Sequence, residues 1–278
     1  MTIAYLGPFA SFSSLAAGQL FPSAALEAFS SIRDCFLAVQ NNSVDKAVVP
    51  LENSIEGTVS MTLDYLYDFK GISIEAEAVM PVEHQLLLHP SNTEFDCVMS
   101  HPQALAQCFH FLESNYPNVQ RRDYHSTAAA AQYVLDHPAE RVAAIANRSA
   151  ANLYGLKMIH ENIHDFEQNH TRFIVISQRR ETPTFNLEKT SEKSSLLLTL
   201  PDDHAGGLHQ ALSVFAWRNM NLSKIESRTL KTGLGKYFFF INVDGLKHPV
   251  LFDNAVQELE ALNISVKFLG HYQEYLLS

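Results

Sequence analysis

Cysteine and long apolar runs are both scarce in this sequence. The three cysteines, Cys35, Cys97 and Cys108, are odd in number and form no C-x-x-C pair. This favours reduced thiols in a cytoplasm over a disulfide framework or a zinc site. No apolar run approaches the ~18 residues of a membrane span, and residues 1–8 lack the basic region and apolar core of a secretory signal. We therefore expect a cytoplasmic protein with no membrane partner.

Positive charge is also in short supply. Lys and Arg number 20 against 30 Asp and Glu, which gives a net charge of −10 and argues against nucleic acid as a partner. The 13 histidines are scattered along the chain, and we expect no metal site. An anionic ligand would have to be held by local cations and helix N-termini, against the average field of the protein.

Hydrophobic residues make up 46% of the chain, and their pattern alternates between strands and helices as in parallel βαβ units. A chain of this length predicts two or three domains. The expected strands span 2–6, 24–29, 45–51, 72–80, 82–89, 95–99, 118–123, 141–146 and 171–177. The expected helices span 12–20, 31–41, 53–68, 100–114, 126–131 and 148–154.

Polar residues follow several of the expected strands. Helix starts are predicted near Ser11, Asn53, Ser100 and Ser126, and open α/β sheets bind ligands at such strand ends. The long return of the chain to a strand near 171 suggests two α/β lobes with a cleft between them, crossed near Met80 and again near Glu161. A single sheet is the alternative.

The composition changes after residue 178. Residues 179–193 are rich in charge, Ser and Thr and are interpreted as a linker. Residues 194–278 predict the order βαββαβ, a ferredoxin-like module whose open sheet edge favours dimerisation. The domains expected are thus 1–178, in two lobes, and 194–278.

The stretch from Asn169 to Ile176 begins with polar residues and becomes a β-branched apolar run, typical of a buried strand. Thr171 and Arg172 at its mouth would suit an anionic substrate, because Arg binds carboxylates in a bidentate way. The alternative is a strand with a polar first turn and no chemistry.

Taken together in this order, the motifs of residues 1–178 resemble those of the prephenate dehydratase family. The resemblance covers nearly the whole chain, with Ala10 and Ser11 standing where the family has Gly and Thr. The motifs are Gly7-Pro8 with Phe12-Ser13, Glu52-Asn53-Ser54-x-Glu56-Gly57, Ser100-His101-Pro102-Gln103-Ala104, Ser126-Thr127-Ala128, Ala150-Ala151-x-x-Tyr154-Gly155 and Asn169-x-Thr171-Arg172-Phe173.

The family resemblance implies a two-lobed catalytic region like that of periplasmic binding proteins. It also implies a carbon–oxygen lyase of phenylalanine biosynthesis that converts prephenate to phenylpyruvate, carbon dioxide and water without a cofactor. We expect Thr171 to donate or relay a proton to the leaving hydroxyl, and Arg172 to clamp a carboxylate directly or by shaping the loop. The remaining candidates are Asn53, Ser100, Gln107 and Thr127, with Glu52, Ser54, Glu56 and Phe173 in support.

Several of these residues have an alternative reading. For Glu52 and Glu56, a salt bridge at a helix start or hinge competes with a catalytic acid, because a carboxylate repels a dianion. Packing is favoured for Phe173, and helix capping for His101. His170 would face away from Thr171, because adjacent side chains alternate along a strand.

The C-terminal module resembles the ACT regulatory domain. Gly206-Gly207-Leu208 with Leu212, and Asn221-Leu222-Ser223-Lys224-Ile225-Glu226-Ser227-Arg228, are similar to its two motifs, with Thr229 in place of the usual Pro. The resemblance implies feedback inhibition by L-phenylalanine, bound between ACT domains of a homodimer or homotetramer. The binding residues would be Gly206, Gly207, Leu208, Ser223, Ile225, Glu226, Ser227 and Arg228. An ACT domain without ligand is the alternative.

A rival function is a non-catalytic sensor in which two lobes bind an amino acid or another carboxylate. Such a binder needs Arg172 but has no use for a proton donor at Thr171. An assay for phenylpyruvate formed from prephenate separates the two functions.

Overall fold

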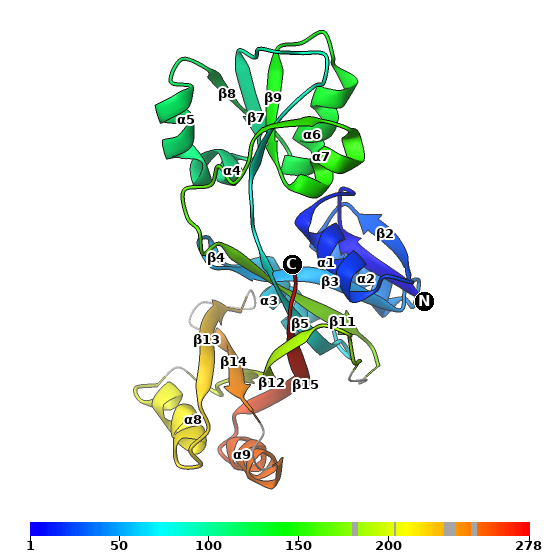
Figure 1. Ribbon diagram of the computed structural model, residues 1–278. Coiled ribbons are helices and arrows are strands. Elements are labelled where there is room, and N and C mark those ends of the chain that lie inside the picture. The colour runs from blue at the N-terminus through cyan, green and yellow to red at the C-terminus, as the bar shows by residue number, and fades with distance from the viewer. Residues whose placement is uncertain (180–182, 203, 231–236, 246–248) are drawn as a thin grey trace.

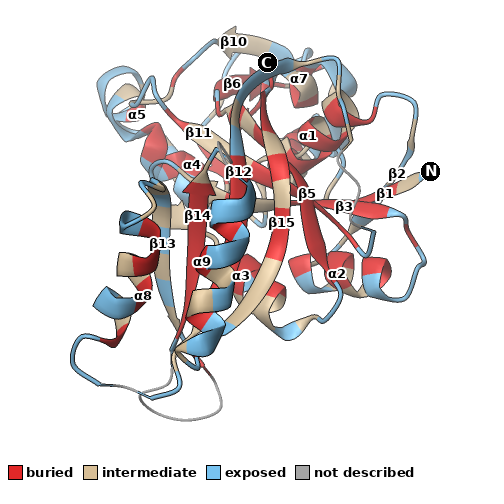
Figure 2. Cartoon of the chain, turned by 90° about the horizontal axis from the view of Figure 1, so that it is seen from below, coloured by how far each residue is buried: buried red, intermediate tan, exposed pale blue. Residues whose placement is uncertain are grey.

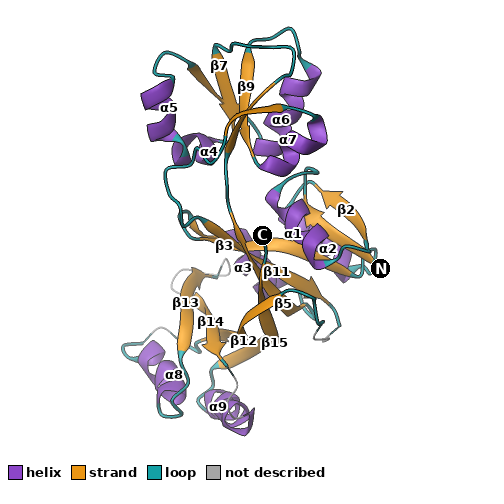
Figure 3. Ribbon diagram, in the orientation of Figure 1, coloured by secondary structure: helices purple, strands orange, loops and turns teal. Residues whose placement is uncertain are grey.

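The chain builds two sheets, one above the other in Figure 1, in a computed structural model that describes residues 1–278 except 180–182, 203, 231–236 and 246–248. The larger sheet has the order β13-β14-β12-β15-β5-β11-β3-β1-β2, with β4 beside β3, and the smaller has the order β10-β6-β9-β7-β8. Both sheets carry helices, as Figure 3 shows. The predicted α/β class is confirmed.

The first lobe combines the beginning of the chain with one later strand. Its central strands are parallel, except that β11 runs antiparallel between β3 and β5. The elements are β1 (Thr2–Leu6), α1 (Phe12–Leu20), β2 (Ala25–Phe29), α2 (Ile32–Gln40), β3 (Lys46–Asn53), β4 (Gly57–Thr58), α3 (Ser60–Asp68), β5 (Ser73–Pro81) and β11 (His170–Ser177).

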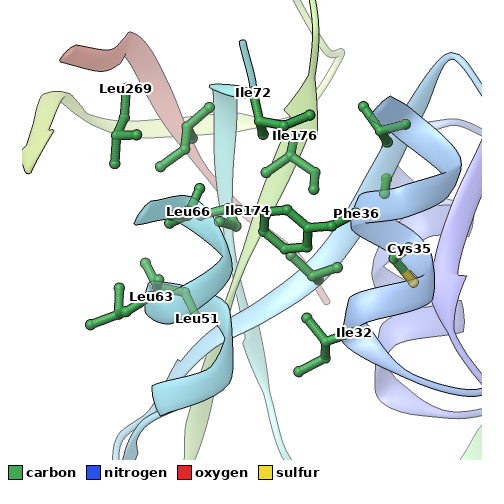
Figure 4. Close-up of a cluster of buried hydrophobic side chains, with 14 of the residues drawn as sticks. Ile32, Cys35, Phe36, Leu51, Leu63, Leu66, Ile72, Ile174, Ile176 and Leu269 are labelled. Atoms are coloured by element: carbon green, nitrogen blue, oxygen red, sulfur yellow. The ribbon is translucent and has the colours of Figure 1, made fainter. Parts of the chain in front are cut away.

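Apolar side chains cover both faces of this sheet. Helix α1 packs on one face, where Phe173 and Val175 of β11 lie with Tyr5 and Val48. Helices α2 and α3 pack on the other, and Figure 4 shows Phe36 beside Ile174 and Ile176. The alternation of β11 between two apolar layers explains why its sequence turns continuously apolar after the polar start.

The second lobe is a smaller sheet whose strands β7, β8 and β9 are parallel. Helices α4 and α5 cover one face, and helices α6 and α7 the other (Figure 1). Strand β10 is absent from the sequence prediction. The elements are β6 (Gln85–Leu88), β7 (Cys97–Ser100), α4 (Pro102–Gln107), α5 (Phe109–Asn115), β8 (Gln120–Asp123), α6 (Thr127–Asp136), β9 (Val142–Ala146), α7 (Arg148–Tyr154) and β10 (Lys157–His160).

Two segments connect the lobes, residues 82–84 on the way out and residues 161–169 on the return. They are bonded to each other, because the Val82 amide donates to the Asn169 carbonyl (2.8 Å) and the Ile163 amide to the His84 carbonyl (2.9 Å). We call 82–84 the outgoing crossing and 161–169 the return crossing.

The C-terminal module has the predicted βαββαβ order. It consists of β12 (Glu188–Thr199), α8 (Gly207–Ala216), β13 (Leu222–Thr229), β14 (Tyr237–Asp244), α9 (Pro249–Ala261) and β15 (Ser265–Leu276). Figure 2 shows β14 largely buried and the outer faces of α8 and α9 exposed. Strand β12 begins inside the predicted linker 179–193, of which 180–182 lie outside the described residues.

The sheet of this module continues into the first lobe. Residues 273–276 of β15 pair in parallel with residues 76–79 of β5. At Gly270, a Cβ would lie 2.2 Å from the carbonyl oxygen of Ile74, so only glycine allows this approach. The sequence predicted a shorter last strand, 265–270, and no junction of the sheets.

Two predicted helix starts are wrong. Asn53 ends β3 and is followed by β4, and the helix begins only at Ser60. Ser100 is the last residue of β7, so His101 caps α4, where its ring accepts from the Gln103 amide (3.3 Å). The helix predicted over 100–114 is divided at Cys108 into α4 and α5.

Every helix of the described chain is too short or too polar to span a bilayer. Within the same residues, no group of three or more His, Cys, Asp or Glu side chains is arranged to hold a metal ion. The three cysteines are buried.

Candidate active site

Thr171 lies where the two lobes meet. In the sheet it pairs with Asn53 on one side and Met80 on the other, both near the ends of their strands. The Asn53 side-chain amide donates to Thr171 Oγ1 at 2.9 Å. Strand pairing and this hydrogen bond therefore fix the Thr171 hydroxyl at the edge of the first lobe.

The orientation of the Asn53 side chain is determined by its backbone neighbours. Its Oδ1 accepts from the amides of Ile55 (3.0 Å) and Glu56 (3.1 Å), so its Nδ2 must face Thr171. Because Nδ2 occupies an acceptor position of the Thr171 oxygen, the hydroxyl hydrogen of Thr171 remains available to another acceptor. Asn53 thus closes a turn, as an Asx residue often does, instead of starting a helix.

A chain of side-chain amides continues from Asn53 into the second lobe. Asn53 Nδ2 also donates to Asn169 Oδ1 (2.8 Å), and Asn169 Nδ2 donates to Gln107 Oε1 (3.0 Å). The same Gln107 oxygen lies 3.0 Å from His84 Nε2, and Gln107 Nε2 lies 3.4 Å from Glu56 Oε1. Gln107 belongs to the second lobe, so this chain of hydrogen-bonded side-chain amides joins the two lobes.

His84 is buried in this chain, with 2% of its surface exposed. Burial lowers the pKa of His84 to about 4, although the hydrogen bond with Gln107 acts in the opposite direction. The ring is therefore neutral at pH 7, and Nε2 carries its hydrogen because Gln107 offers an oxygen. Nδ1 has no hydrogen-bond partner among the described residues.

A cavity of about 280 Å³ lies between the lobes near Met80, the strand neighbour of Thr171. Phe12 and Leu15 line it from the first lobe, and Asn147 and Arg148 from the second. The Phe12 ring also meets the His84 ring edge-on at 6.0 Å. The cavity therefore adjoins the amide chain, although the predicted site residues are not among those that line it.

The other predicted residues differ in how they relate to Thr171. Ser54 braces the return crossing, because its hydroxyl donates to the Gln168 carbonyl (3.0 Å) and accepts from the His170 amide (2.9 Å). Ser100 is fully buried, and its hydroxyl donates to the Ile145 carbonyl (2.7 Å). Thr127 is the first residue of α6, behind the Ser126 cap.

The ion pairs of Arg172 lie away from this cluster. Its guanidinium binds three carboxylates, namely Glu52 (3.1 Å), Glu77 (3.2 Å) and Glu274 (3.4 Å). Side chains alternate along β11, so Arg172 faces the side of the sheet opposite to Thr171. The guanidinium is occupied by the protein itself, which supports the indirect role over a direct clamp on substrate.

These carboxylates belong to a charged cluster between the first lobe and the C-terminal module, which we call the junction. Lys193 binds Glu77 (2.7 Å) and Glu274, and Lys224 of β13 binds Glu52 (2.7 Å). Burial raises the pKa of Glu52, but the hydrogen bonds and charges of Lys224 and Arg172 outweigh it and hold this pKa below its usual value. Glu52 is therefore an ionised partner in a salt bridge, which is the alternative that the sequence offered to a catalytic acid.

Glu77 is the deepest carboxylate of the junction. Complete burial raises the pKa of Glu77 to about 7, with Lys193 and Arg172 opposing the change and the nearby Glu274 adding to it. At Glu274 burial acts to raise the pKa, but hydrogen bonds from Glu77, Lys193 and Thr190 outweigh it and lower this pKa to about 2. Near neutral pH, both the protonated and the ionised form of Glu77 are therefore populated.

Phe173 packs in the core of the first lobe, with 2% of its surface exposed. It is not among the residues that line the cavity, in agreement with the packing role that the sequence favoured. Glu56 is exposed; its side chain contacts Gln107, and its backbone amide donates to Asn53.

The family model described as "Prephenate dehydratase" matches residues 3–181. The chain belongs to the prephenate dehydratase family. It is 44% identical to the prephenate dehydratase of Bacillus subtilis over 286 residues, which cover 100% of both chains. A solved prephenate dehydratase from Arthrobacter aurescens, in complex with L-Phe, is 33% identical with a TM-score of 0.84, covering 98% of this chain and 90% of that one.

A third relative has the same fold and another activity in its name. "GqqA- a novel type of quorum quenching acylases" is 27% identical with a TM-score of 0.85, covering 99% of this chain and 98% of that one. The matches along the full chain confirm the predicted family and the predicted class of enzyme, a carbon–oxygen lyase.

The predicted effector residues divide between two faces of the C-terminal module. Glu226 accepts from the Thr58 hydroxyl (3.1 Å), and Arg228 donates to Asp64 (3.0 Å), so both are docked on the first lobe. Ile225 and Ser227 pair with Ile241 and Phe239, whose side chains lie under α8 and α9.

Strand β13 lies next to α8 in Figures 1 and 2. Gly206 precedes α8 with a left-handed φ of 90°, and α8 begins at Gly207 and Leu208. Ser223 is exposed at the start of β13. Of the predicted set, Ile225 and Ser227 therefore share the helix-covered face of the sheet with the start of α8, and Glu226 and Arg228 do not.

Sequence reasoning missed two residues of the amide chain and one motif. Asn169 stands in the motif that marks Thr171 and could have been chosen there, whereas nothing near His84 distinguishes it. Residues 160–164 have the spacing H-E-x-x-H, which was overlooked, but they leave β10 for a loop instead of forming the helix that this zinc motif needs. His160 Nε2 is instead bound to the Tyr116 hydroxyl (2.6 Å).

Proposed function

We propose that this chain converts prephenate to phenylpyruvate, carbon dioxide and water, with Thr171 as the proton donor to the leaving hydroxyl. The observation that carries this role is the orientation of Asn53, which donates to Thr171 Oγ1 and leaves the Thr171 hydrogen free. Membership of the prephenate dehydratase family supports the substrate. No cofactor is needed, because formation of an aromatic ring drives the loss of both groups.

A threonine hydroxyl is a weak acid, so orientation must supply most of its effect. Asn53 contributes by stabilising negative charge on Oγ1 as the proton leaves, since it already donates to that oxygen. The substrate carboxylates would be held by helix N-termini, among them α1 behind its Ser11 cap and α6 behind its Ser126 cap. Arg172 acts from the far face by holding the strand that carries Thr171.

The test follows phenylpyruvate formation with purified wild-type protein, Thr171→Ala and Thr171→Ser. Thr171→Ala should abolish turnover and leave substrate binding largely intact, whereas Thr171→Ser keeps a hydroxyl and part of the rate. Thr93→Ala, at an exposed loop of the second lobe, is the matched control. Near-normal rates in Thr171→Ala would remove Thr171 from this role, and a wild-type protein that binds prephenate without forming product would be a sensor.

We further propose feedback inhibition by L-phenylalanine through the C-terminal module. The support is the junction, where Lys224 of β13 reaches Glu52 (2.7 Å) and the Thr58 hydroxyl (2.8 Å). Glu52 directly precedes Asn53, which holds Thr171. An effector that shifts β13 would therefore act on the proton donor through one ion pair, and a coupling of ~1–3 kcal/mol is typical of such regulation.

Lys224→Met tests this route, because it keeps most of the side-chain volume and removes the charge. Phenylalanine should still bind, as measured by calorimetry, but should inhibit much less, with basal kcat within roughly twofold of wild type. Lys157→Met, at an exposed lysine of the second lobe, is the control. Unchanged inhibition in Lys224→Met would exclude this ion pair as the route.

We also propose that the protein works as a homodimer or homotetramer in the cytoplasm. In the described part of the sheet, β13 has a neighbour on one side only, β14, so its free edge can pair with another copy. Sedimentation at several concentrations, with and without phenylalanine, measures the state of assembly. A monomer under all these conditions would refute it.

A further inference from the structure

Gln107 receives hydrogen bonds from both crossings between the lobes. His84 of the outgoing crossing and Asn169 of the return crossing approach the same Gln107 side-chain oxygen at 3.0 Å. The backbone carbonyl of Gln107 also accepts from the Asp165 amide of the return crossing (2.7 Å). One residue of the second lobe is therefore in contact with both connections to the first.

The chain of amides allows one orientation at each member. The backbone amides of residues 55 and 56 fix Asn53, which in turn presents Nδ2 to Asn169. Asn169 must then offer Nδ2 to Gln107. If the Gln107 amide turned over, its NH₂ group would face the Asn169 NH₂ group and its oxygen would face the Glu56 carboxylate, and both of these contacts would be lost.

All three inner members of the chain are buried. Asn169, His84 and Gln107 are 1%, 2% and 6% exposed, so an unpaired polar atom among them would be costly. Water cannot easily replace a missing partner here. Without the Gln107 oxygen, Asn169 Nδ2 has lost its acceptor, and a shift of Asn169 removes one of the contacts that hold Asn53 Nδ2 beside Thr171.

We infer that Gln107 is a positioning residue that ties both crossings to the orientation of Thr171. Gln107 acts through Asn169 and Asn53, without contact with the substrate. His84 helps to hold the Gln107 side-chain amide in place through its hydrogen bond with the Gln107 oxygen. Closure of the lobes and orientation of the proton donor are then one event, because the second lobe supplies an essential member of the chain. This inference rests on the proposed role of Thr171.

The experiment compares variants that keep and remove the hydrogen bonds. Gln107→Met removes both acceptor and donor at similar volume and should lower kcat on the order of 10- to 100-fold with KM for prephenate nearly unchanged. Gln103→Met, on the same helix but exposed, should have no effect. His84→Leu should lower kcat in the same way, whereas His84→Gln, whose amide nitrogen takes the place of Nε2, should restore most of it.

A double variant separates positioning from a general loss of structure. Residues in one chain act in series, so Gln107→Met with His84→Leu should be no slower than the slower single variant, whereas independent defects would multiply. Multiplied losses, a change in KM alone, or failure of His84→Gln to restore kcat would overturn the inference. Full activity in Thr171→Ala would refute the proposed donor instead, and the two failures are therefore distinguishable.

Discussion

Two buried groups should give the stability of this protein opposite dependences on pH. Glu77 keeps its proton up to about pH 7 in the folded chain, against an ordinary pKa of 4.5. His84 stays neutral down to about pH 4, against an ordinary pKa of 6.5. Both side chains are at least nine-tenths buried. Replacing each in turn by a residue that does not titrate should reveal its contribution to the pH dependence of the free energy of unfolding.

The sign of each effect follows from where the proton is bound. Between pH 4.5 and 7, the unfolded chain releases the Glu77 proton and the folded chain keeps it, so the free energy of unfolding falls as pH rises. Between pH 4 and 6.5, the unfolded chain binds a proton at His84 and the folded chain does not, so the free energy of unfolding rises. At 1.36 kcal/mol for each pH unit, each group contributes about 3 kcal/mol across its window, and in the wild type the two nearly cancel.

The variants are Glu77→Gln and His84→Gln, which keep the shape and the main hydrogen bonds. Urea unfolding at pH values from 4 to 7.5 gives the free energy of unfolding of each relative to wild type, and other titrating groups cancel in that difference. Relative to wild type, Glu77→Gln should gain about 3 kcal/mol as pH rises from 4.5 to 7, and His84→Gln should lose about as much between pH 4 and 6.5. A difference that stays constant with pH for either variant would refute the reasoning for that group.

Further predictions concern the junction of the sheets and Arg172. Gly270→Ala should lower the free energy of unfolding by about 2 kcal/mol or more, because the new Cβ would meet the Ile74 carbonyl at 2.2 Å; Gly18→Ala, in α1 with its closest contact at 3.9 Å, should raise it by up to about 1 kcal/mol. Urea unfolding measures both, and an unaffected Gly270→Ala would contradict the close approach. Arg172→Met should lower stability by about 1.5–3 kcal/mol, because Glu52, Glu77 and Glu274 each lose one cationic partner while Lys193 and Lys224 remain. If it instead abolishes turnover at unchanged stability, Arg172 binds the substrate directly.

The sequence alone predicted most elements of the first lobe and the order βαββαβ of the C-terminal module. These predictions succeeded because apolar periodicity reflects burial within one element and its immediate partner. Strand β10 was missed because its residues are partly exposed and lack a clear apolar alternation. The length of β15 was missed because its second half, 271–276, lies between β12 and β5, and β5 is almost two hundred residues away in the sequence.

The sequence indicated candidate residues that stand in recognisable motifs, and it missed contacts that depend on remote partners. Thr171 and Asn53 stand in their motifs and lie 2.9 Å apart in the structure. For Arg172 the sequence left a direct clamp and an indirect role open, although the alternation that turns His170 away from Thr171 turns Arg172 away as well. Its three carboxylates come from distant strands, and no spacing in the sequence announces them.

The close junction between β15 and β5 has a consequence for how the protein can be dissected. A chain cut after Arg179 would lose Lys193 and Glu274 together, leaving the buried Glu77 to Arg172 alone. It would also strip β5 of its outer neighbour and present a long apolar edge to solvent, which invites aggregation. The C-terminal module is therefore part of the structural support of the first lobe. If a truncated protein no longer responded to phenylalanine, structural damage to the first lobe would explain the result as well as loss of an effector site. Single substitutions at the interface therefore test regulation better than truncation does.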